Sequence, residues 1–486
     1  MACAVGAIVI GVAGAGRPAS ARPAEAPAQQ ATPKCDWRDV GNLNRSVAYA
    51  ASAMDTTNGV MYVYGGYSDP SAQFQTQSAI STITFGATLT AGDTKVAALS
   101  VSGAPDREAL AGVYRPKGDD SAIYWIAGRN NSGDTNNDVY EYKIKTKAWS
   151  RLATSGAFGD RDEHVAAYDP KHDVIWVAAG ESKACTSVPC QAPAMPTHYL
   201  QFDATTGAAS WHDGPSGGPR AKGPTMVYDA KKERMLVFGG TPDGSKGTDG
   251  LWALDLSDAD VTKAKWAEVK PAGTGPSVAV HGAAYDAERN WMVVYGGMKT
   301  NYAVGNKETG ETRTFALDLN VDPPMWRNLG STVGDRIQPV MEYLPQHKAV
   351  VMTSGRVAIL DPVQDQFTKR TIHALVCAAV VEPTATTPHG PRPTDTPGTG
   401  PQPTAMPTPT LNASPDICES VKSRVPPAVL NAAAGAPNTI SGYGQPCNPN
   451  LPAGPLNPLR RFLNLQNPSV RFHPLYNGVV WKCGCQ

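Results

Sequence analysis

The sequence predicts an all-β protein built from six copies of a four-stranded unit. Two observations lead to this prediction. An apolar strand that ends on glycine, as in ERMLVFGG (233–240), recurs at intervals of roughly 50 to 60 residues. The second to fifth copies are each followed by a variable polar loop and two more strand-like segments, the second of which carries a tryptophan. A four-stranded sheet with two apolar faces can bury both by stacking radially against copies of itself, which predicts a β-propeller.

The first half of each unit is an apolar strand ending near Tyr-Asp, a polar turn, and a second apolar strand that ends on glycine. Glycine at that exit permits the positive φ angles that a tight turn requires. The six copies read AMDTTNGVMYVYGG from Ala53, VYRPKGDDSAIYWIAG from Val113, AYDPKHDVIWVAAG from Ala167, VYDAKKERMLVFGG from Val227, AYDAERNWMVVYGG from Ala284 and EYLPQHKAVVMTSG from Glu342.

The second half of each unit supplies the third and fourth strands. Examples are DVYEYKIKTKAW, HYLQFDATTGAASW, GLWALDLSDADVTKAKW and RTFALDLNVDPPMW. Large aromatic side chains on the fourth strand can fill the space between neighbouring sheets. The tryptophans expected there are Trp149, Trp211, Trp266 and Trp326.

Closure of the ring requires the two ends of the repeat region to meet. CDWRDV (35–40) is expected to be an isolated fourth strand, and IHALVCAAVV (372–381) is an extra strand after the sixth unit. We therefore predict that these segments pair and that Cys35 bonds to Cys377. A disulfide closing so long a loop stabilises by up to about 5 kcal/mol on the chain-entropy model. A seventh, degenerate blade is the alternative.

The order of apolar run, glycine pair, tyrosine and tryptophan resembles the kelch repeat, over about residues 35–381. The resemblance implies a propeller of the galactose oxidase and kelch superfamily, of the secreted bacterial type with a Pro/Thr linker. It also implies that the motif residues have a structural role.

The rest of the chain differs in composition. Residues 1–21 are expected to be a signal peptide, with an apolar run followed by Ala19-Ser20-Ala21, and 22–34 to be flexible. Residues 382–411 are expected to be a disordered Pro/Thr-rich linker. Residues 412–486 are expected to form a small α/β or irregular module that needs disulfides as staples.

Cysteine usage fits export, because eight cysteines remain once Cys3 is removed with the signal peptide. Cys185 and Cys190 in CTSVPC could close a small loop. In the C-terminal module, Cys418 and Cys447 are each expected to pair with one of Cys483 and Cys485. The pairing order stays open. No metal or cofactor is expected.

The candidate ligand-binding residues lie just before or within the first strand of several units. Arginines occur there in five of the six units, and two units add a histidine. Arginines converging on one axis would suit an anionic ligand such as a uronic or sialic acid, although internal salt bridges are the alternative. The residues are Arg45, Arg107, Arg161, His164, Arg220, His281 and Arg336.

The net charge and the motifs limit the classes of function that the protein can have. The chain has 43 basic and 43 acidic residues, which argues against a nucleic-acid binder, and it has no stretch long enough to span a membrane. We expect an extracellular, non-catalytic binding or surface-assembly protein. Its propeller would take a glycan or protein partner, and its C-terminal module could dock to a cell surface or partner chain. The alternative is a carbohydrate-active enzyme, mutarotase-like or copper-radical oxidase-like, at the propeller mouth, with Glu163 the most suggestive acid–base residue.

Overall fold

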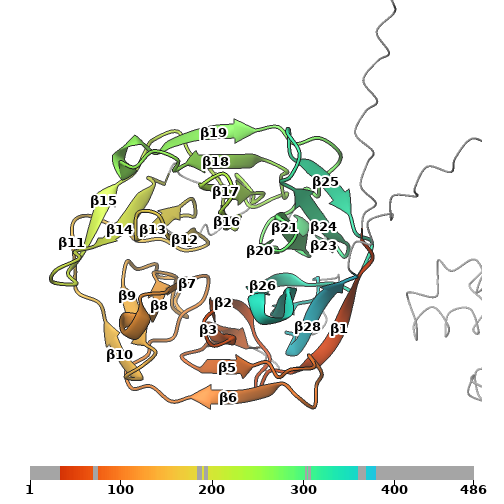
Figure 1. Cartoon of the computed structure of the whole chain (residues 1–486), viewed down its shortest axis with the longest axis horizontal. Helices are drawn as coiled ribbons and strands as arrows, with labels where there is room; N and C mark the ends of the chain where they lie inside the picture. The colour runs from red at the N-terminus through yellow and green to blue at the C-terminus, as the bar shows by residue number, and fades with distance from the viewer. Residues whose placement is uncertain are drawn as a thin grey trace, which may run out of the picture. The chain divides into compact units, whose positions relative to one another are not determined.

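Six sheets form a ring around a central axis in this computed structural model (Figure 1). The ring lies within the unit that spans 1–384. Among the described residues each blade has four main strands, which confirms the six-bladed prediction and makes the seven-bladed alternative wrong. The described residues are 33–68, 75–182, 189–190, 195–301, 304, 308–358 and 368–378.

In each blade the first strand lies nearest the axis and the fourth lies at the rim (Figure 1). Blade 1 contains β2 (Ala48–Asp55), β3 (Val60–Ser68), β5 (Ile80–Thr84) and β6 (Lys95–Leu99), with β4 (Gln75–Thr76) beside β3. Blade 2 contains β7 (Ala111–Arg115), β8 (Ala122–Ile126), β9 (Val139–Lys143) and β10 (Ala148–Arg151). Blade 3 contains β12 (Val165–Asp169), β13 (Val174–Ala178), β14 (His198–Phe202) and β15 (Ala209–Asp213), with β11 (Thr154–Ser155) outside.

The second half of the ring repeats this pattern. Blade 4 contains β16 (Thr225–Asp229), β17 (Arg234–Phe238), β18 (Leu251–Asp255) and β19 (Lys265–Val269). Blade 5 contains β20 (Gly282–Asp286), β21 (Trp291–Tyr295), β24 (Thr314–Asp318) and β25 (Met325–Asn328). Blade 6 contains β26 (Ile337–Leu344), β27 (Ala349–Arg356), β28 (Thr371–Cys377) and β1 (Cys35–Asn42). The smaller elements are the β22 (Met298–Thr300) and β23 (Thr309–Gly310) pair and the 3₁₀ turns η1 (Gly118–Asp120), η2 (Val261–Lys263) and η3 (Pro345–His347).

The ring closes as the sequence predicts. Strand β1 pairs antiparallel with β28, with Cys35 opposite Cys377, and a disulfide joins the two cysteines. The Trp37 indole on β1 donates a hydrogen bond of 2.8 Å to the Thr314 hydroxyl of blade 5. The first strand of the chain therefore completes the last blade.

The glycines at the strand exits also connect the blades. In all six blades the backbone N–H of the second glycine, or of its equivalent, donates to a carbonyl just before the next blade's first strand. Gly240 shows why no side chain fits: its φ is +85°, and a Cβ there would lie 2.8 Å from the Ala221 Cβ and 2.9 Å from the Lys222 carbonyl oxygen. The motif therefore serves the joint between blades as well as the turn.

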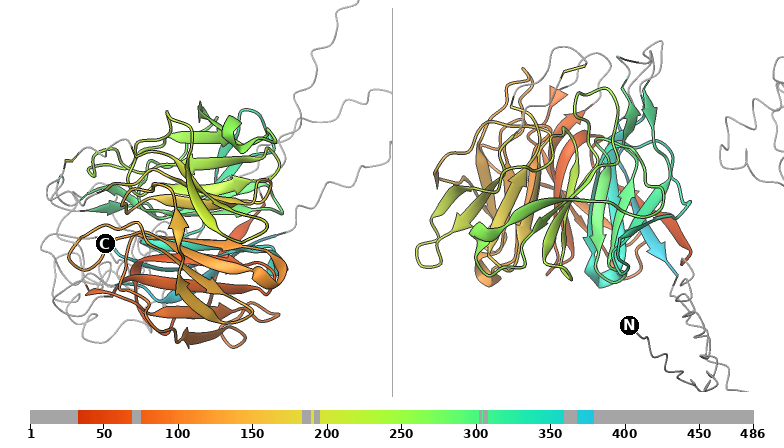
Figure 2. Two further views of the ribbon diagram at one scale, coloured as in Figure 1. Left: turned by 90° about the vertical axis from the view of Figure 1, so that its left-hand side faces the viewer. Right: turned by 90° about the horizontal axis from the view of Figure 1, so that it is seen from above.

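The apolar core lies between blades. One cluster contains Val113 and Tyr124 of blade 2 with Leu200 and Trp211 of blade 3, and another joins blades 4 and 5 in the same way. The expected tryptophans do lie on fourth strands, in β10, β15, β19 and β25. In the side views, the inner strands of the blades run roughly along the ring axis (Figure 2).

Several predictions concern residues outside the described ranges. These are the signal peptide (1–21), the linker (382–411), the C-terminal module (412–486) with its four cysteines, and Cys185. Cys190 is disulfide-bonded. No helix in the described part of the chain is long and apolar enough to cross a membrane.

Candidate functional site

A ring of left-handed residues surrounds the axis where the chain enters the first strands. In five of its six steps the backbone N–H of one residue donates to the carbonyl of its predecessor in the previous blade, at 2.7 to 3.0 Å. All six residues have φ between +48° and +61°, and five are not glycine. Such backbone is strained for residues with a side chain and often marks functional sites. The six are Tyr49, Ala109, Glu163, Gly223, Val280 and Gln338.

The ring lines a small cavity of about 120 Å³. Its wall consists of the six ring residues and the residue that follows each of them. Three ring residues, Tyr49, Glu163 and Gln338, bring a phenol, a carboxylate and an amide to this wall. Among the residues that line the cavity, Glu163 is the one with an acidic side chain, and no lysine or arginine is present.

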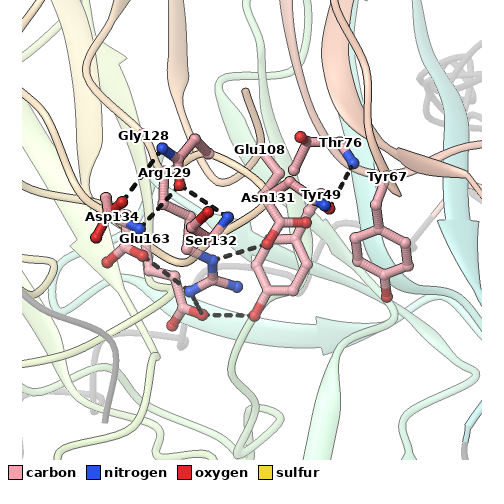
Figure 3. Close-up of polar contacts among 12 residues, drawn as sticks. Tyr49, Tyr67, Thr76, Glu108, Gly128, Arg129, Asn131, Ser132, Asp134 and Glu163 are labelled. Atoms are coloured by element: carbon pink, nitrogen blue, oxygen red, sulfur yellow. Dashed lines mark hydrogen bonds and ion pairs between the residues drawn. The ribbon is translucent and has the colours of Figure 1, made fainter. Parts of the chain in front are cut away.

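Arg129 pairs with the acidic residues on one side of this cavity, the mouth of the propeller (Figure 3). Its guanidinium donates to Glu108 and to Asp162, at 2.8 Å each, and lies 3.5 Å from Glu163. The Tyr49 hydroxyl donates to the Glu163 carboxylate at 2.6 Å. Figure 3 shows Tyr49 and Glu163 joined by this hydrogen bond, with Arg129 beside them. One cation therefore faces three carboxylates that come from two blades.

Burial sets the electrostatics of this cluster. It raises the pKa of the Asp162 carboxyl, which is fully buried, and the neighbouring Glu163 and Glu181 raise it further while Arg129 lowers it. Burial also raises the pKa of Glu108, against the effect of Arg129. The Tyr49 pKa is raised well above its ordinary value by burial and by the Glu163 charge. Tyr49 is therefore a neutral hydrogen-bond donor throughout the physiological range.

A second polar group lies on the opposite side of Tyr49. The Tyr67 hydroxyl donates to the Gln338 side-chain oxygen at 3.1 Å, and the rings of Tyr49 and Tyr67 are 6.0 Å apart. Arg356 forms a bidentate pair with Glu308, and both side chains are buried. Two phenols and an amide therefore lie together here, with the buried Arg356–Glu308 pair next to Tyr67.

The two predicted histidines both line the cavity. Burial lowers the pKa of each to about 3, so both are neutral. His281 shares a hydrogen bond of 2.7 Å with Thr225 through Nε2. His164 is 6% exposed, and neither of its ring nitrogens has a hydrogen-bond partner among the described residues. A buried imidazole with two unmet polar atoms is uncommon, and its position on the cavity wall fits contact with a ligand.

The predicted arginines lie elsewhere. Three of them donate to carbonyls of their own blades: Arg45 to Val63 and Gly65, Arg161 to Gly159 and Pro196, and Arg336 to Ser354 and Thr371. Burial lowers the pKa of these three to about 10. Arg107 pairs with Asp138 at 3.5 Å, and Arg220 is exposed. None of the five is among the residues lining the cavity. Ligand binding by these arginines stays a prediction.

Sequence inspection singled out Glu163 but missed Tyr49, Arg129, Glu108 and Gln338. Arg129 follows the exit glycine of blade 2, in a loop where the repeats differ, and that irregularity is the signal that could have marked it. Within the described ranges no group of three or more His, Cys, Asp and Glu side chains has the geometry to hold a metal ion.

Comparison with known proteins supports the fold. The chain is similar to the solved structure titled "Structure of YjhT", with a TM-score of 0.50 and 17% sequence identity, covering 68% of this chain and 96% of that chain. No protein-family model and no curated protein matches the sequence. At this identity the likeness shows the shared propeller fold alone.

Proposed function

We propose that this protein binds a carbohydrate outside the cell, at the mouth formed by the left-handed ring. The observation that carries the proposal is the Tyr49–Glu163 hydrogen bond on the cavity wall, beside Gln338 and the unpartnered His164. A carboxylate, an amide, an imidazole and a phenol are directional partners for sugar hydroxyls. A site built to hydrogen-bond hydroxyls rejects ligands that lack them, because its own buried polar groups are then left unpaired.

The charge of the wall selects the kind of sugar. Glu163 is acidic, His164 and His281 are neutral, and the cations Arg129 and Arg356 are already paired with carboxylates. An uncharged sugar therefore fits better than the uronic or sialic acid that an arginine ring would take. The cavity of about 120 Å³ is smaller than a typical ligand pocket, so it would hold one end of a glycan whose remainder contacts the surrounding loops.

Export is part of the same proposal. The disulfide between Cys35 and Cys377 is of the kind that persists in oxidising compartments. The kelch-like repeat and the segments before and after the propeller are consistent with a secreted modular protein.

A glycan array followed by isothermal titration of the full chain tests the proposal. We expect binding of neutral glycans, weakened about tenfold or more by Glu163→Gln and by Tyr49→Phe, because each removes one charge-assisted hydrogen bond. Glu268→Gln, an exposed position on β19, is the matched control and should leave affinity unchanged. Absence of glycan binding, or binding that both mouth variants retain in full, would contradict the proposal.

A second candidate is acid–base catalysis on a sugar, such as interconversion of anomers. It is favoured by the pairing of a neutral phenol with a carboxylate at 2.6 Å, next to the buried Asp162 whose pKa is raised. The measurement is the exchange rate between anomers of reducing sugars by NMR. Acceleration that Glu163→Gln abolishes while sugar binding persists would establish an enzyme. Without any acceleration, the catalytic candidate is wrong and only the binding function stands.

A further inference from the structure

A larger cavity lies where the six inner strands end, at the other end of the axis from the left-handed ring. Its volume is about 630 Å³, within the range of pockets that hold small organic ligands. Every blade contributes the last residues of its first strand and part of the turn that follows. The wall is mostly Ala, Val, Met and Pro, together with five tyrosines: Tyr114, Tyr168, Tyr228, Tyr285 and Tyr343.

The tyrosines contribute aromatic surface to this wall. The hydroxyls of Tyr114, Tyr168 and Tyr285 are hydrogen-bonded to Thr57, Asp173 and Asn290 in the turns that follow first strands, at 2.7 to 2.9 Å. Burial raises the pKa of all five phenols above the ordinary value, so they are neutral at physiological pH. The face of such a ring is electronegative and attracts cations.

One residue breaks the repeat in this wall. The position before the tyrosine, or before Met54 in blade 1, is apolar in five blades and is Glu342 in the sixth. The apolar residues are Ala53, Val113, Ala167, Val227 and Ala284. Glu342 is the charged residue among those that line the cavity.

The Glu342 carboxylate has a hydrogen-bond donor but no counter-ion among the residues that the structure describes. The Ser52 hydroxyl donates to one of its oxygens, at 2.7 Å. Among the described residues no lysine, arginine or histidine forms an ion pair with it, and the other titratable groups of the cavity wall are the five tyrosines. A carboxylate in apolar surroundings is costly unless a cation accompanies it.

We propose that this cavity binds a small organic cation, an amine or quaternary ammonium group on an apolar body, with Glu342 as its counter-ion. The carboxylate neutralises the ligand, the tyrosines of the wall supply aromatic surface for its positive charge, and the alanine, valine and methionine side chains bury its apolar part. This site lies on different residues from the sugar site and does not depend on it.

Binding also depends on pH in a defined direction. Burial raises the pKa of Glu342 to about 7, and the Ser52 hydrogen bond opposes this effect. The carboxyl must ionise to pair with a cation, and the five tyrosines stay neutral below pH 8. We therefore expect affinity for a permanently charged ligand to be at least about tenfold higher at pH 8 than at pH 5.

Isothermal titration of the full chain with hexyltrimethylammonium tests the proposal. At pH 8 we expect saturable binding, with hexan-1-ol and hexanoate binding at least about tenfold more weakly. Glu342→Gln should reduce cation affinity by a similar factor, and Tyr228→Leu should reduce it severalfold while leaving the carboxylate in place. Glu268→Gln should have no effect.

Glutamine keeps the acceptor for Ser52 and removes a buried charge, so the Glu342→Gln variant should fold. No binding of the ammonium probe by the parent protein, equal binding of hexan-1-ol, or unchanged cation affinity in Glu342→Gln would each overturn the proposal.

Discussion

Glu342→Gln should make the protein more stable at alkaline pH. The pKa of Glu342 is raised from its ordinary 4.5 to about 7, mainly by burial. The folded state therefore binds this proton more tightly than the unfolded chain. The stability contributed by the group is complete below pH 4.5 and is lost as the pH rises through 7. With 1.36 kcal/mol for each pKa unit, ionisation costs the folded state about 3 kcal/mol above pH 7.

The variant has no proton to lose at this position and keeps an oxygen for the Ser52 hydroxyl. At pH 8 we expect its free energy of unfolding to exceed that of the parent by up to about 3 kcal/mol, and at pH 5 the difference should be less than about 1 kcal/mol. Asp162, whose pKa is also raised, is present in both proteins and cancels in the difference. Guanidinium titrations followed by tryptophan fluorescence measure both values. A stability difference that is the same at pH 5 and pH 8 would refute the reasoning.

Three further predictions concern the scaffold. Replacing Cys35 and Cys377 together by serine opens a loop of 342 residues, should destabilise by up to about 5 kcal/mol, and should speed hydrogen exchange of β1; unchanged exchange would contradict closure by this bond. Gly240→Ala should destabilise by at least about 2 kcal/mol, and more than Gly217→Ala, because both have φ of +85° but a Cβ meets neighbours within 3 Å only at Gly240. If both variants lowered the denaturation midpoint equally, the steric clash of the Cβ at Gly240 would be excluded as a cause. Arg129→Met leaves three paired carboxylates without their cation, so it should cost about 3 to 5 kcal/mol at pH 8. The cost should be smaller at pH 5, because burial raises the pKa of Asp162 and this carboxyl then takes up a proton; thermal unfolding at both pH values checks this.

Much of the fold follows from patterns that are local in the chain. Apolar runs that end on glycine mark the second strand of each blade, and the tryptophans mark fourth strands, as β10, β15, β19 and β25 confirm. Even the closure was predictable, because Trp37 and Cys35 reproduce a fourth strand in isolation and need a partner. These features can be predicted because each residue type has the same structural role in every copy of the repeat.

The sites were less predictable because they depend on where the copies differ. The arginines at equivalent positions looked like a converging ring, yet Arg45, Arg161 and Arg336 donate to backbone carbonyls of their own blades. A charged residue that recurs from repeat to repeat more readily binds a group that also recurs, and here that group is the backbone carbonyls of the blade, which need hydrogen-bond donors.

The sequence by itself determined the four-stranded unit, the order of its strands and the bond that closes the ring, because these follow from the repeat and its two ends, whereas the structure decided for six blades over seven. Only the tertiary structure decided which residues meet on the axis. Tyr49 and Glu163 are 114 residues apart and share a hydrogen bond because left-handed backbone turns both toward one mouth. Glu342 stands out only once six strand ends are brought around a single cavity, where one carboxylate replaces an apolar side chain.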